Sequence, residues 1–235
     1  MSFAAIILSA GSSTRFGREV EKQYLSINGK PILMYSVDIF EQVSEINEYY
    51  IVAKNEKFDF ITRDIISRYR VKKFRGMIEG GNLRCNSVMN ALHHLTANSK
   101  SEFVLIHDSA RPLITIGFVG EIISGVKEFG GCIPGLPVTD TIKETDSSEL
   151  IKATPDRTRL FAVQTPQGFR LKELYRAYLK GMTEGFEGTD DAAYFERIGE
   201  KVKVIKGLYS NLKITYPADI ELAKIFLRER EHENN

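Results

Sequence analysis

Short apolar runs alternate with helical patterns along the chain, and this alternation constrains the fold more than any other feature. Leu33, Val37 and Phe40 recur on one face of a predicted helix that starts at Pro31, a residue tolerated in a first helical turn. Such alternation predicts an α/β fold: a mostly parallel, twisted, Rossmann-like sheet with helices on both faces. The predicted strands are Phe3–Ser9, Tyr49–Ala53, Lys73–Met77, Phe103–His107, Phe161–Gln164, Lys203–Ile205 and Leu212–Thr215.

The alternation is interrupted after Cys132. The next segment has two early prolines, a polar turn at Asp146–Ser148 and strand-like residues on each side. We interpret residues 137–159 as a β-hairpin arm that projects from a single domain spanning residues 1–235. Isolated hairpins are only marginally stable in water, so the arm is expected to pack against a partner subunit or its own domain. A last helix is expected from about Pro217 into a charged, solvated tail.

The charge balance excludes some classes of partner. The 235 residues include 32 basic and 31 acidic side chains, so no overall field attracts nucleic acid or an anionic membrane. Any anion site must depend on a local cluster of cations. Cys85 and Cys132 lack the spacing of metal ligands or of a disulfide framework. No run approaches the roughly 20 apolar residues that span a bilayer. We therefore expect a cytoplasmic protein.

The sequence LSAGSSTRFGREVEKQY follows the first apolar run and changes abruptly to small residues and cations. Ser9, Ala10 and Gly11 would let the backbone approach a ligand with its N–H groups. Arg15 and Lys22 add mobile positive charge. The pattern is neither the phosphate loop ending in Gly-Lys-Ser/Thr nor the dinucleotide fingerprint G-x-G-x-x-G. It favours polyphosphate binding, with a plain surface loop as the alternative.

Asp108, in the segment VLIHDSARP, lies at the carboxyl end of a predicted buried strand, where ligands of open α/β sheets bind. A carboxylate there suits Mg²⁺, which uses one or two carboxylates together with phosphate oxygens. The alternative is a turn cap formed by Asp108, with Arg111 paired to a nearby acid. His107 has no partner spacing for zinc and is interpreted as structural.

Two other segments offer polar groups near the same predicted sheet edge. In EGGNLRCNSV, Asn82 is expected to cap the following helix, and polar groups such as Ser87 could read a base; a purely capping role is the alternative. Lys213 lies inside a predicted late strand. Because a buried cation needs a partner, Lys213 either faces solvent or meets an anion at the sheet edge.

The sequence shows no Ser-His-Asp or Cys-His arrangement that would supply a protein nucleophile. A phosphate monoester that attacks another phosphate is largely ionised at neutral pH, because its second pKa is about 6, and it needs no general base. A site for such a reaction must cancel repulsion between anions and stabilise the charge that develops at phosphorus. Lysine, arginine and a metal ion are sufficient for that task.

Several motifs occur together in one order: LSAGSSTRFG, GGNLRCNSV, HDSARP, PVTDTIK, TPQGF, TDDA and NLKIT. In this order and spacing, the chain resembles the 2-C-methyl-D-erythritol 4-phosphate cytidylyltransferase family over nearly its whole length. The glycine-containing loop alone indicates only the broad nucleotidyltransferase superfamily. The combination of HDSARP, TDTIK and TPQGF is much more specific. The resemblance implies transfer of CMP from CTP to 2-C-methyl-D-erythritol 4-phosphate, with release of pyrophosphate.

The resemblance also implies roles for residues at the nucleotide. Ala10, Gly11 and Ser87 match positions that hold the base and ribose of CTP. Arg15 and Lys22 match cations that bind the triphosphate, with Lys22 on the α-phosphate in the transition state.

Further roles implied by the resemblance concern the metal and the acceptor. Asp108 matches the carboxylate near the metal, expected to be Mg²⁺. Thr141, Arg157, Thr189 and Lys213 match positions around the methylerythritol phosphate, and Lys213 also approaches the reacting phosphate. In the family the arm crosses to a second subunit of a homodimer, so Thr141 and Arg157 would serve the neighbour's site.

The chain departs from the family pattern at three positions. Glu21 stands where proline usually precedes the Lys-Gln pair, Ser13 replaces a frequent glycine, and Asn82 replaces a frequent aspartate near the base. These departures affect the rigidity of the loop, its path over the phosphates and the contact to the base, respectively. An enzyme for another polyol phosphate, such as ribitol 5-phosphate, and a non-catalytic nucleotide-binding regulator are the alternative functions. An NAD-dependent oxidoreductase is disfavoured because AGSSTR lacks the spaced glycines.

Overall fold

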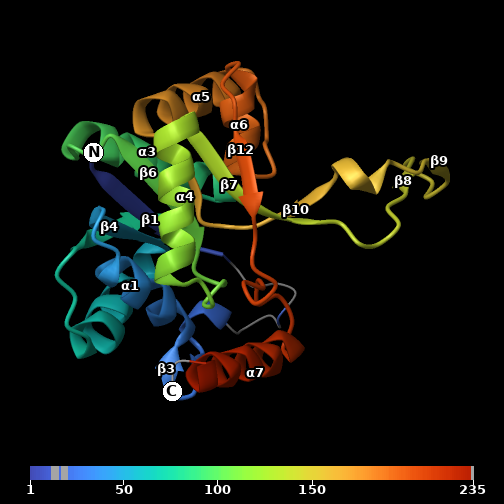
Figure 1. The fold of residues 1–235 in the computed structure, drawn as a ribbon. Helices are drawn as coiled ribbons and strands as arrows, with labels where there is room; N and C mark the ends of the chain where they lie inside the picture. Colours follow the sequence, from blue (N-terminus) through green and yellow to red (C-terminus); the bar gives the residue numbers. More distant parts are fainter. Residues whose placement is uncertain (12–15, 17–20, 234–235) are drawn as a thin grey trace.

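The structure is a computed structural model, and it describes residues 1–11, 16 and 21–233. Its centre is one large mixed sheet with helices on both faces (Figure 1). The strands of this sheet are β1 (Phe3–Leu8), β4 (Ile46–Ala53), β5 (Phe74–Glu79), β6 (Phe103–Asp108), β7 (Gly131–Pro137), β10 (Phe161–Val163), β11 (Gln167–Arg170) and β12 (Lys203–Lys206). Their order is β10-β7-β11-β6-β1-β4-β5, and β12 pairs with β7 outside that path.

The helices pack on opposite faces because side chains alternate along each strand. Phe3, Ala5 and Ile7 of β1 join a buried cluster with α1 (Ile32–Gln42) and α4 (Ile116–Phe129). Ala4 and Ile6 join a second cluster, which includes α3 (Arg84–Asn98), α5 (Leu171–Thr183) and α6 (Asp191–Arg197). Short helical segments follow β4, namely η2 (Asn55–Lys57), α2 (Phe58–Phe60), η3 (Ile61–Ile65) and η4 (Ile66–Arg68).

The α/β fold with a mostly parallel sheet is confirmed. β1 lies parallel to both β4 and β6, β5 is parallel to β4, and β12 is parallel to β7. β11 runs antiparallel between β6 and β7, and β10 is antiparallel to β7. The carboxyl ends of β1, β4, β5 and β6 therefore meet at one edge of the sheet.

The strand predicted at Leu212–Thr215 is wrong. This segment has no regular secondary structure. Its backbone bonds to groups outside a sheet ladder: the Ile214 N–H donates to the Ala110 carbonyl at 2.8 Å, and the Asn211 carbonyl accepts from Arg111 at 2.8 Å. The side chain of Ile214 is buried, which anchors the segment.

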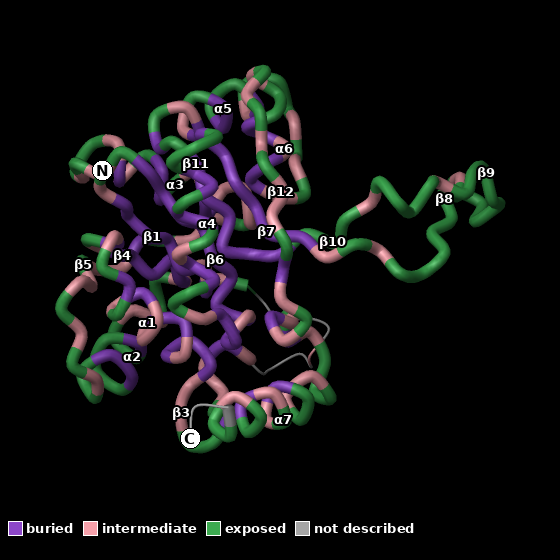
Figure 2. Tube along the Cα trace, viewed as in Figure 1, coloured by how far each residue is buried: buried purple, intermediate pink, exposed green. Residues whose placement is uncertain are grey.

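A long excursion leaves the sheet between β7 and β10 and projects from the body of the molecule (Figure 1). It contains the two-stranded ribbon of β8 (Glu144–Thr145) and β9 (Ile151–Ala153), followed by the short helix η5 (Arg157–Arg159). Figure 2 shows it almost entirely exposed, and the projecting hairpin arm of the predicted fold is confirmed. Leu150 is 67% exposed and Ile151 is 64% exposed.

The carboxyl-terminal helix α7 (Ala218–Glu233) packs beside the small ribbon of β2 (Ser26–Ile27) and β3 (Lys30–Pro31). The expected charged tail continues this helix, and most of its described side chains are exposed. Arg230 donates to the carbonyls of Leu113 and Ile114 at 2.6 and 3.2 Å. Among the described residues, no helix combines the length and the apolar character needed to cross a membrane.

Candidate active site

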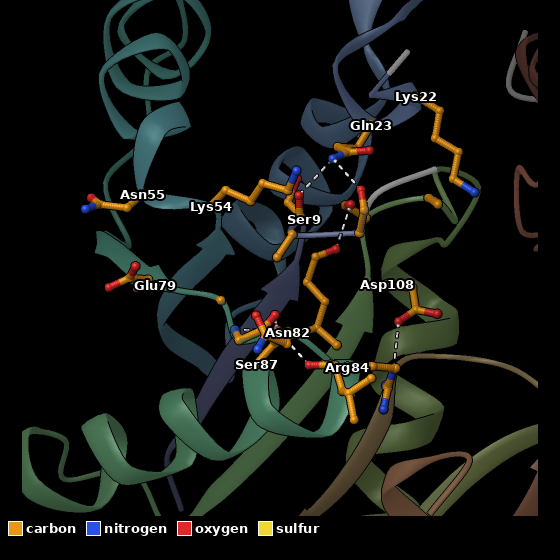
Figure 3. A pocket seen from close by; sticks show the side chains of 18 of the residues that line it. Ser9, Lys22, Gln23, Lys54, Asn55, Glu79, Asn82, Arg84, Ser87 and Asp108 are labelled. Carbon is orange, nitrogen blue, oxygen red and sulfur yellow. Dashed lines mark hydrogen bonds and ion pairs between the residues drawn. The ribbon is translucent and has the colours of Figure 1, made fainter. Parts of the chain in front are cut away.

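A cavity of about 640 Å³ opens at the carboxyl ends of β1, β4, β5 and β6 (Figure 3). It is the place where open α/β sheets bind ligands. Eight residues that the sequence analysis singled out line this cavity, although they come from five separate segments: Ser9, Ala10, Gly11, Lys22, Asn82, Ser87, Asp108 and Lys213. Arg15 and Ser13 lie outside the described residues.

The backbone of the loop after β1 is held by the side chain of Gln23. Its Nε2 donates to the Ser9 carbonyl at 2.8 Å and to the Gly11 carbonyl at 3.4 Å. Gln23 is 3% exposed and belongs to the short helix η1 (Lys22–Tyr24). The sequence reading missed this contact, because a glutamine beside a lysine carries no pattern that specifies a backbone acceptor.

The opposite wall of the cavity begins at Gly80, where the backbone lies very close to the loop after β1. A Cβ atom at Gly80 would lie 2.5 Å from the Ala10 Cβ and 3.3 Å from the Ser87 Oγ. Ser87 Oγ accepts from the Gly81 N–H at 3.0 Å and donates to the Leu83 carbonyl at 3.2 Å. A glycine at position 80 therefore allows two walls of the cavity to approach each other.

The expectation that Asn82 caps α3 is wrong. The residue at the N-cap is Leu83, and Asn86 Oδ1 accepts the Leu83 N–H at 3.1 Å. The cap therefore comes from a side chain inside the first helical turn. Asn82 lies one residue before the cap and lines the cavity, so its side chain is left available for a ligand.

Asp108 ends β6 and is paired with two cations. Lys213 Nζ lies 2.6 Å from Oδ2, and Arg84 Nε lies 3.3 Å from Oδ1. Burial opposes ionisation of this carboxyl, yet the charges of Arg84 and Lys213 outweigh that effect and hold its pKa well below the usual range. The carboxylate is therefore ionised at neutral pH. The alternative in which Lys213 simply faces solvent does not describe this structure.

Arg84 continues the network behind the cavity wall. Its guanidinium makes two bonds to Asp191, of 2.9 and 2.7 Å, and Tyr178 donates to the same carboxylate at 2.6 Å. Asp191 is completely buried, and its N–H donates to Gln167 Oε1 at 3.1 Å. The bidentate geometry fixes the plane of the guanidinium, which keeps Arg84 Nε oriented toward Asp108.

His107 is linked to Asp108 through the side chain of Thr165. Its Nε2 lies 3.1 Å from the Arg111 carbonyl, which can only accept, so Nε2 carries the proton. Nδ1 then accepts from the Thr165 hydroxyl at 3.0 Å, and Thr165 Oγ1 accepts the Asp108 N–H at 3.1 Å. Burial lowers the pKa of His107 to about 3, so the ring is neutral. These contacts agree with a structural role for His107.

The segment that carries Lys213 is fixed by Asn211. The Asn211 side chain donates to the Thr165 carbonyl at 2.9 Å, and its carbonyl accepts from Arg111. The Arg111 side chain therefore donates to a backbone carbonyl, and the alternative in which it pairs with an acid is wrong. Burial lowers the pKa of Arg111. The TPQ segment and Arg111 together set where Lys213 enters the cavity.

Lys22 approaches the cavity from the other side of the loop after β1. Figure 3 shows its side chain extending on the same side as Asp108, away from Asn55. Lys22 and Lys213 therefore both line one cavity, although they lie near opposite ends of the chain. Lys54, Asn55 and Glu56 complete the rim next to β4, and the sequence reading had not singled them out.

Of the four residues expected at the acceptor, Lys213 lines this cavity, whereas Thr141, Arg157 and Thr189 do not. Thr141 and Arg157 lie on the exposed arm, where Arg157 donates to the Thr139 carbonyl at 2.6 Å. Thr189 is exposed and precedes Asp190, whose side chain caps α6 by accepting the Ala193 N–H. Within one chain, the structure thus brings together the nucleotide-side candidates and leaves the arm candidates apart.

A metal ion in this cavity would need oxygen or nitrogen ligands from the chain. Within residues 1–11, 16 and 21–233, no group of three or more His, Cys, Asp or Glu side chains is arranged to hold one. Asp108 could nevertheless bind Mg²⁺ as a single carboxylate, because in nucleotide sites phosphate oxygens and water supply the other ligands. Both of its oxygens already meet cations, so a metal there would compete with Lys213.

Comparison with known proteins identifies the family of this chain. The family model for 2-C-methyl-D-erythritol 4-phosphate cytidylyltransferase matches residues 3–229. The chain belongs to this family. Members of the 2-C-methyl-D-erythritol 4-phosphate cytidylyltransferase family are nucleotidyltransferases and generally depend on a divalent metal.

Individual members of the cytidylyltransferase family cover almost the whole chain. The protein of this name from Caldanaerobacter subterraneus subsp. tengcongensis is 39% identical over 229 residues, which are 97% of this chain and 100% of the relative. The one from Alkaliphilus metalliredigens is 41% identical, over 96% of this chain and 92% of the relative. The crystal structure of 4-diphosphocytidyl-2C-methyl-D-erythritol synthase from Anaerococcus prevotii has a TM-score of 0.84 at 32% identity, covering 97% of this chain and 96% of that one.

Proposed function

We propose that this protein transfers CMP from CTP to 2-C-methyl-D-erythritol 4-phosphate and releases pyrophosphate, a step of non-mevalonate isoprenoid synthesis. The observation that carries the proposal is that Lys22, Asp108 and Lys213 line one cavity beside the loop after β1. Family membership over residues 3–229 supports the same activity.

In this reaction a phosphate oxygen of the acceptor attacks the α-phosphorus of CTP, and the bond to the bridging oxygen of pyrophosphate breaks. The attacking phosphate is already ionised at neutral pH, because its second pKa is about 6. The chain therefore has to bring two anions together and stabilise the charge that develops between them. Lys22 and Lys213 supply positive charge to the α-phosphate, Lys213 from the acceptor side, and Arg15 adds charge at the triphosphate.

A divalent metal, with Mg²⁺ as the expected ion, would be held by Asp108 and the nucleotide phosphates. When bound, it neutralises phosphate charge and polarises the phosphoryl oxygens. The depressed pKa of Asp108 keeps this ligand ionised. Lys213 Nζ lies 2.6 Å from Oδ2 of Asp108, so a metal held by this carboxylate would leave the Lys213 ammonium group available to bind phosphate.

We assign the nucleotide base and ribose to the part of the cavity where the loop after β1 meets the segment from Gly80 to Ser87. Ala10, Gly11, Asn82 and Ser87 line this part of the cavity, and the close approach at Gly80 shapes it. Asn82 does not cap α3, so its amide can hydrogen-bond a base.

The acceptor site is proposed to be completed by a second copy of the chain. Thr141 and Arg157 lie on an arm with little contact to its own domain, and Ile142, Leu150 and Ile151 expose 37, 67 and 64% of their surface. An arm of this kind gains stability by packing against a partner. In the proposed homodimer, Thr141 and Arg157 reach the neighbour's acceptor phosphate, and Thr189 contacts the acceptor as well. The two free thiols suit the proposed cytoplasmic setting.

The deciding experiment measures pyrophosphate release from CTP with 2-C-methyl-D-erythritol 4-phosphate, with ribitol 5-phosphate and with no acceptor. We expect release that depends on the methylerythritol phosphate and on added Mg²⁺. Preferential turnover of ribitol 5-phosphate would overturn the acceptor assignment. CTP binding without pyrophosphate release under any condition would indicate a nucleotide-binding regulator instead.

A further inference from the structure

Lys22 belongs to the short helix η1, and contacts of the neighbouring residues fix the position of this helix. The Tyr24 N–H donates to the Glu21 carbonyl at 3.0 Å and closes the first turn of η1. Gln23 bonds to the carbonyls of Ser9 and Gly11, as described above. This attaches η1 to the end of β1, on one side of the cavity.

A second attachment joins η1 to the segment after β4. Lys57 Nζ of η2 lies 2.6 Å from Glu21 Oε2, and the Tyr24 ring meets the Phe60 ring edge-on, with centroids 5.6 Å apart. β4 is the neighbour of β1 in the sheet. The ion pair and the ring contact therefore hold η1 against two adjacent strand ends.

Glu21 and Lys22 have different environments although they are neighbours in the chain. Lys22 lines the cavity, whereas Glu21 and Lys57 do not. The Lys57 side chain is 34% exposed and that of Glu21 is 20% exposed. Such a pair contributes little to global stability, about 1 kcal/mol or less. Its effect is to restrict where the backbone of Lys22 lies.

We infer that the Glu21–Lys57 ion pair is a positioning device that places Lys22 for phosphoryl transfer. This inference rests on the proposed function. Lys57 touches no substrate in this scheme and acts only through Glu21 and the backbone of η1. Small displacements of a charged group at a reacting phosphate are costly, because an error of about 1 Å can reduce the rate about a hundredfold.

The test is a double-mutant cycle on kcat between Lys57→Ala and Lys22→Ala. In the wild-type background, Lys57→Ala is expected to lower kcat about tenfold. In the Lys22→Ala background it should change kcat less than about twofold, because the group that it positions is already gone. A loss of equal size in both backgrounds, or none in either, would overturn the inference.

Three controls separate positioning from loss of structure. Glu21→Gln keeps the size of the side chain and should reproduce most of the Lys57→Ala defect. The charge-swapped pair Glu21→Lys with Lys57→Glu should recover part of the lost rate, and no recovery would count against the ion pair. Asp59→Asn breaks the nearby exposed pair with Arg63, whose side chains are 74 and 84% exposed, and should leave kcat unchanged. Lack of activity in the wild-type protein would refute the proposed function itself.

Discussion

The ammonium group of Lys213 lies 2.6 Å from Oδ2 of Asp108, although the two residues are 105 positions apart in the chain. Asp108 is fixed by the end of β6, whereas Lys213 lies on a segment without regular secondary structure. The Asp108 carboxylate thus holds the Lys213 ammonium group at the place where phosphate is expected to bind. The contact also keeps two like charges, Lys213 and Arg84, on the same acceptor group.

Removal of either lysine should slow catalysis strongly and spare the fold. We expect Lys22→Ala and Lys213→Ala each to lower kcat by about a hundredfold to a thousandfold, as for other groups that stabilise transition-state charge. Lys213 is 39% exposed, so its loss leaves no buried void. Steady-state kinetics and circular dichroism of both variants provide the measurement. Near-normal turnover in both would exclude the assigned roles.

Arg84→Met should destabilise the protein strongly. Asp191 is fully buried, and Arg84 is the cation that neutralises it. Breaking a buried pair by removing one partner costs about 3 to 5 kcal/mol, because a charge stays behind in a medium that solvates it poorly. Urea unfolding measures this loss. The matched control is Arg63→Met, in the exposed pair with Asp59, where a change below about 1 kcal/mol is expected. Equal effects would contradict the assignment of the network.

His107 should make the protein less stable as the pH falls below neutral. Its pKa is about 3 in the folded protein, against an ordinary value of about 6.5 in the unfolded chain. Between these values the unfolded chain binds one more proton, so stability rises with pH and falls as the pH decreases through 6.5. From pH 7 to pH 5 this single group removes about 2 kcal/mol.

The contribution of His107 can be isolated with His107→Gln. This variant should be less stable at pH 7 but should lose less stability between pH 7 and pH 5 than the wild-type protein. His232→Gln, at an exposed position in α7, serves as the control and should retain the full slope. An unchanged slope in His107→Gln would show that the ring is not held neutral.

Gly80→Ala should impair nucleotide binding. The added methyl group would lie 2.5 Å from the Ala10 Cβ, which is attached directly to the backbone of the loop after β1 and cannot rotate away. We expect the KM for CTP to rise about tenfold or more. Gly120→Ala, in α4, meets nothing within 4 Å and should be neutral or should stabilise the helix by up to about 1 kcal/mol. Kinetics and thermal unfolding of both variants check this, and an unaltered KM in Gly80→Ala would argue against the close approach.

Ile151→Asp should weaken the proposed homodimer. Ile151 is 64% exposed in the single chain, and a charge there costs nothing unless the residue becomes buried in a partner. Sedimentation equilibrium should show a higher dissociation constant and an unchanged unfolding profile for the isolated subunit. Lys152→Asp is a useful neighbour for comparison, because it changes charge without removing apolar area. A monomeric wild-type protein at all concentrations would refute the dimer.

Sequence patterns predicted most strands of the sheet because burial imposes its own period, but they did not predict β7 (Gly131–Pro137) or β11 (Gln167–Arg170). The continuous apolar runs of β1 and β6 are covered on both faces, as parallel strands require. Asp108 could be placed at the ligand edge because it follows such a run directly. Ala10 and Gly11 could be placed there for the same reason, since they follow β1.

Contacts that depend on side-chain direction were not predictable. Arg84 contacts Asp191, which lies 107 positions further along the chain, and no local sequence pattern predicts such a contact. The cap of α3 was predicted at Asn82, whereas the N-cap residue is Leu83, whose N–H donates to Asn86 Oδ1 in the first helical turn. The Lys213 segment has strand-like composition, but its N–H and carbonyl groups find partners on the loop after β6.

The distance in sequence between Asp108 and Lys213 has a consequence for biosynthesis. Until the ribosome reaches position 213 of the 235 residues, the carboxylate exists and its lysine partner does not. Arg84 has already emerged by then and is the cation that can meet it first. A nascent fragment released before residue 213 could build most of the sheet, yet it would lack the charge on which turnover depends.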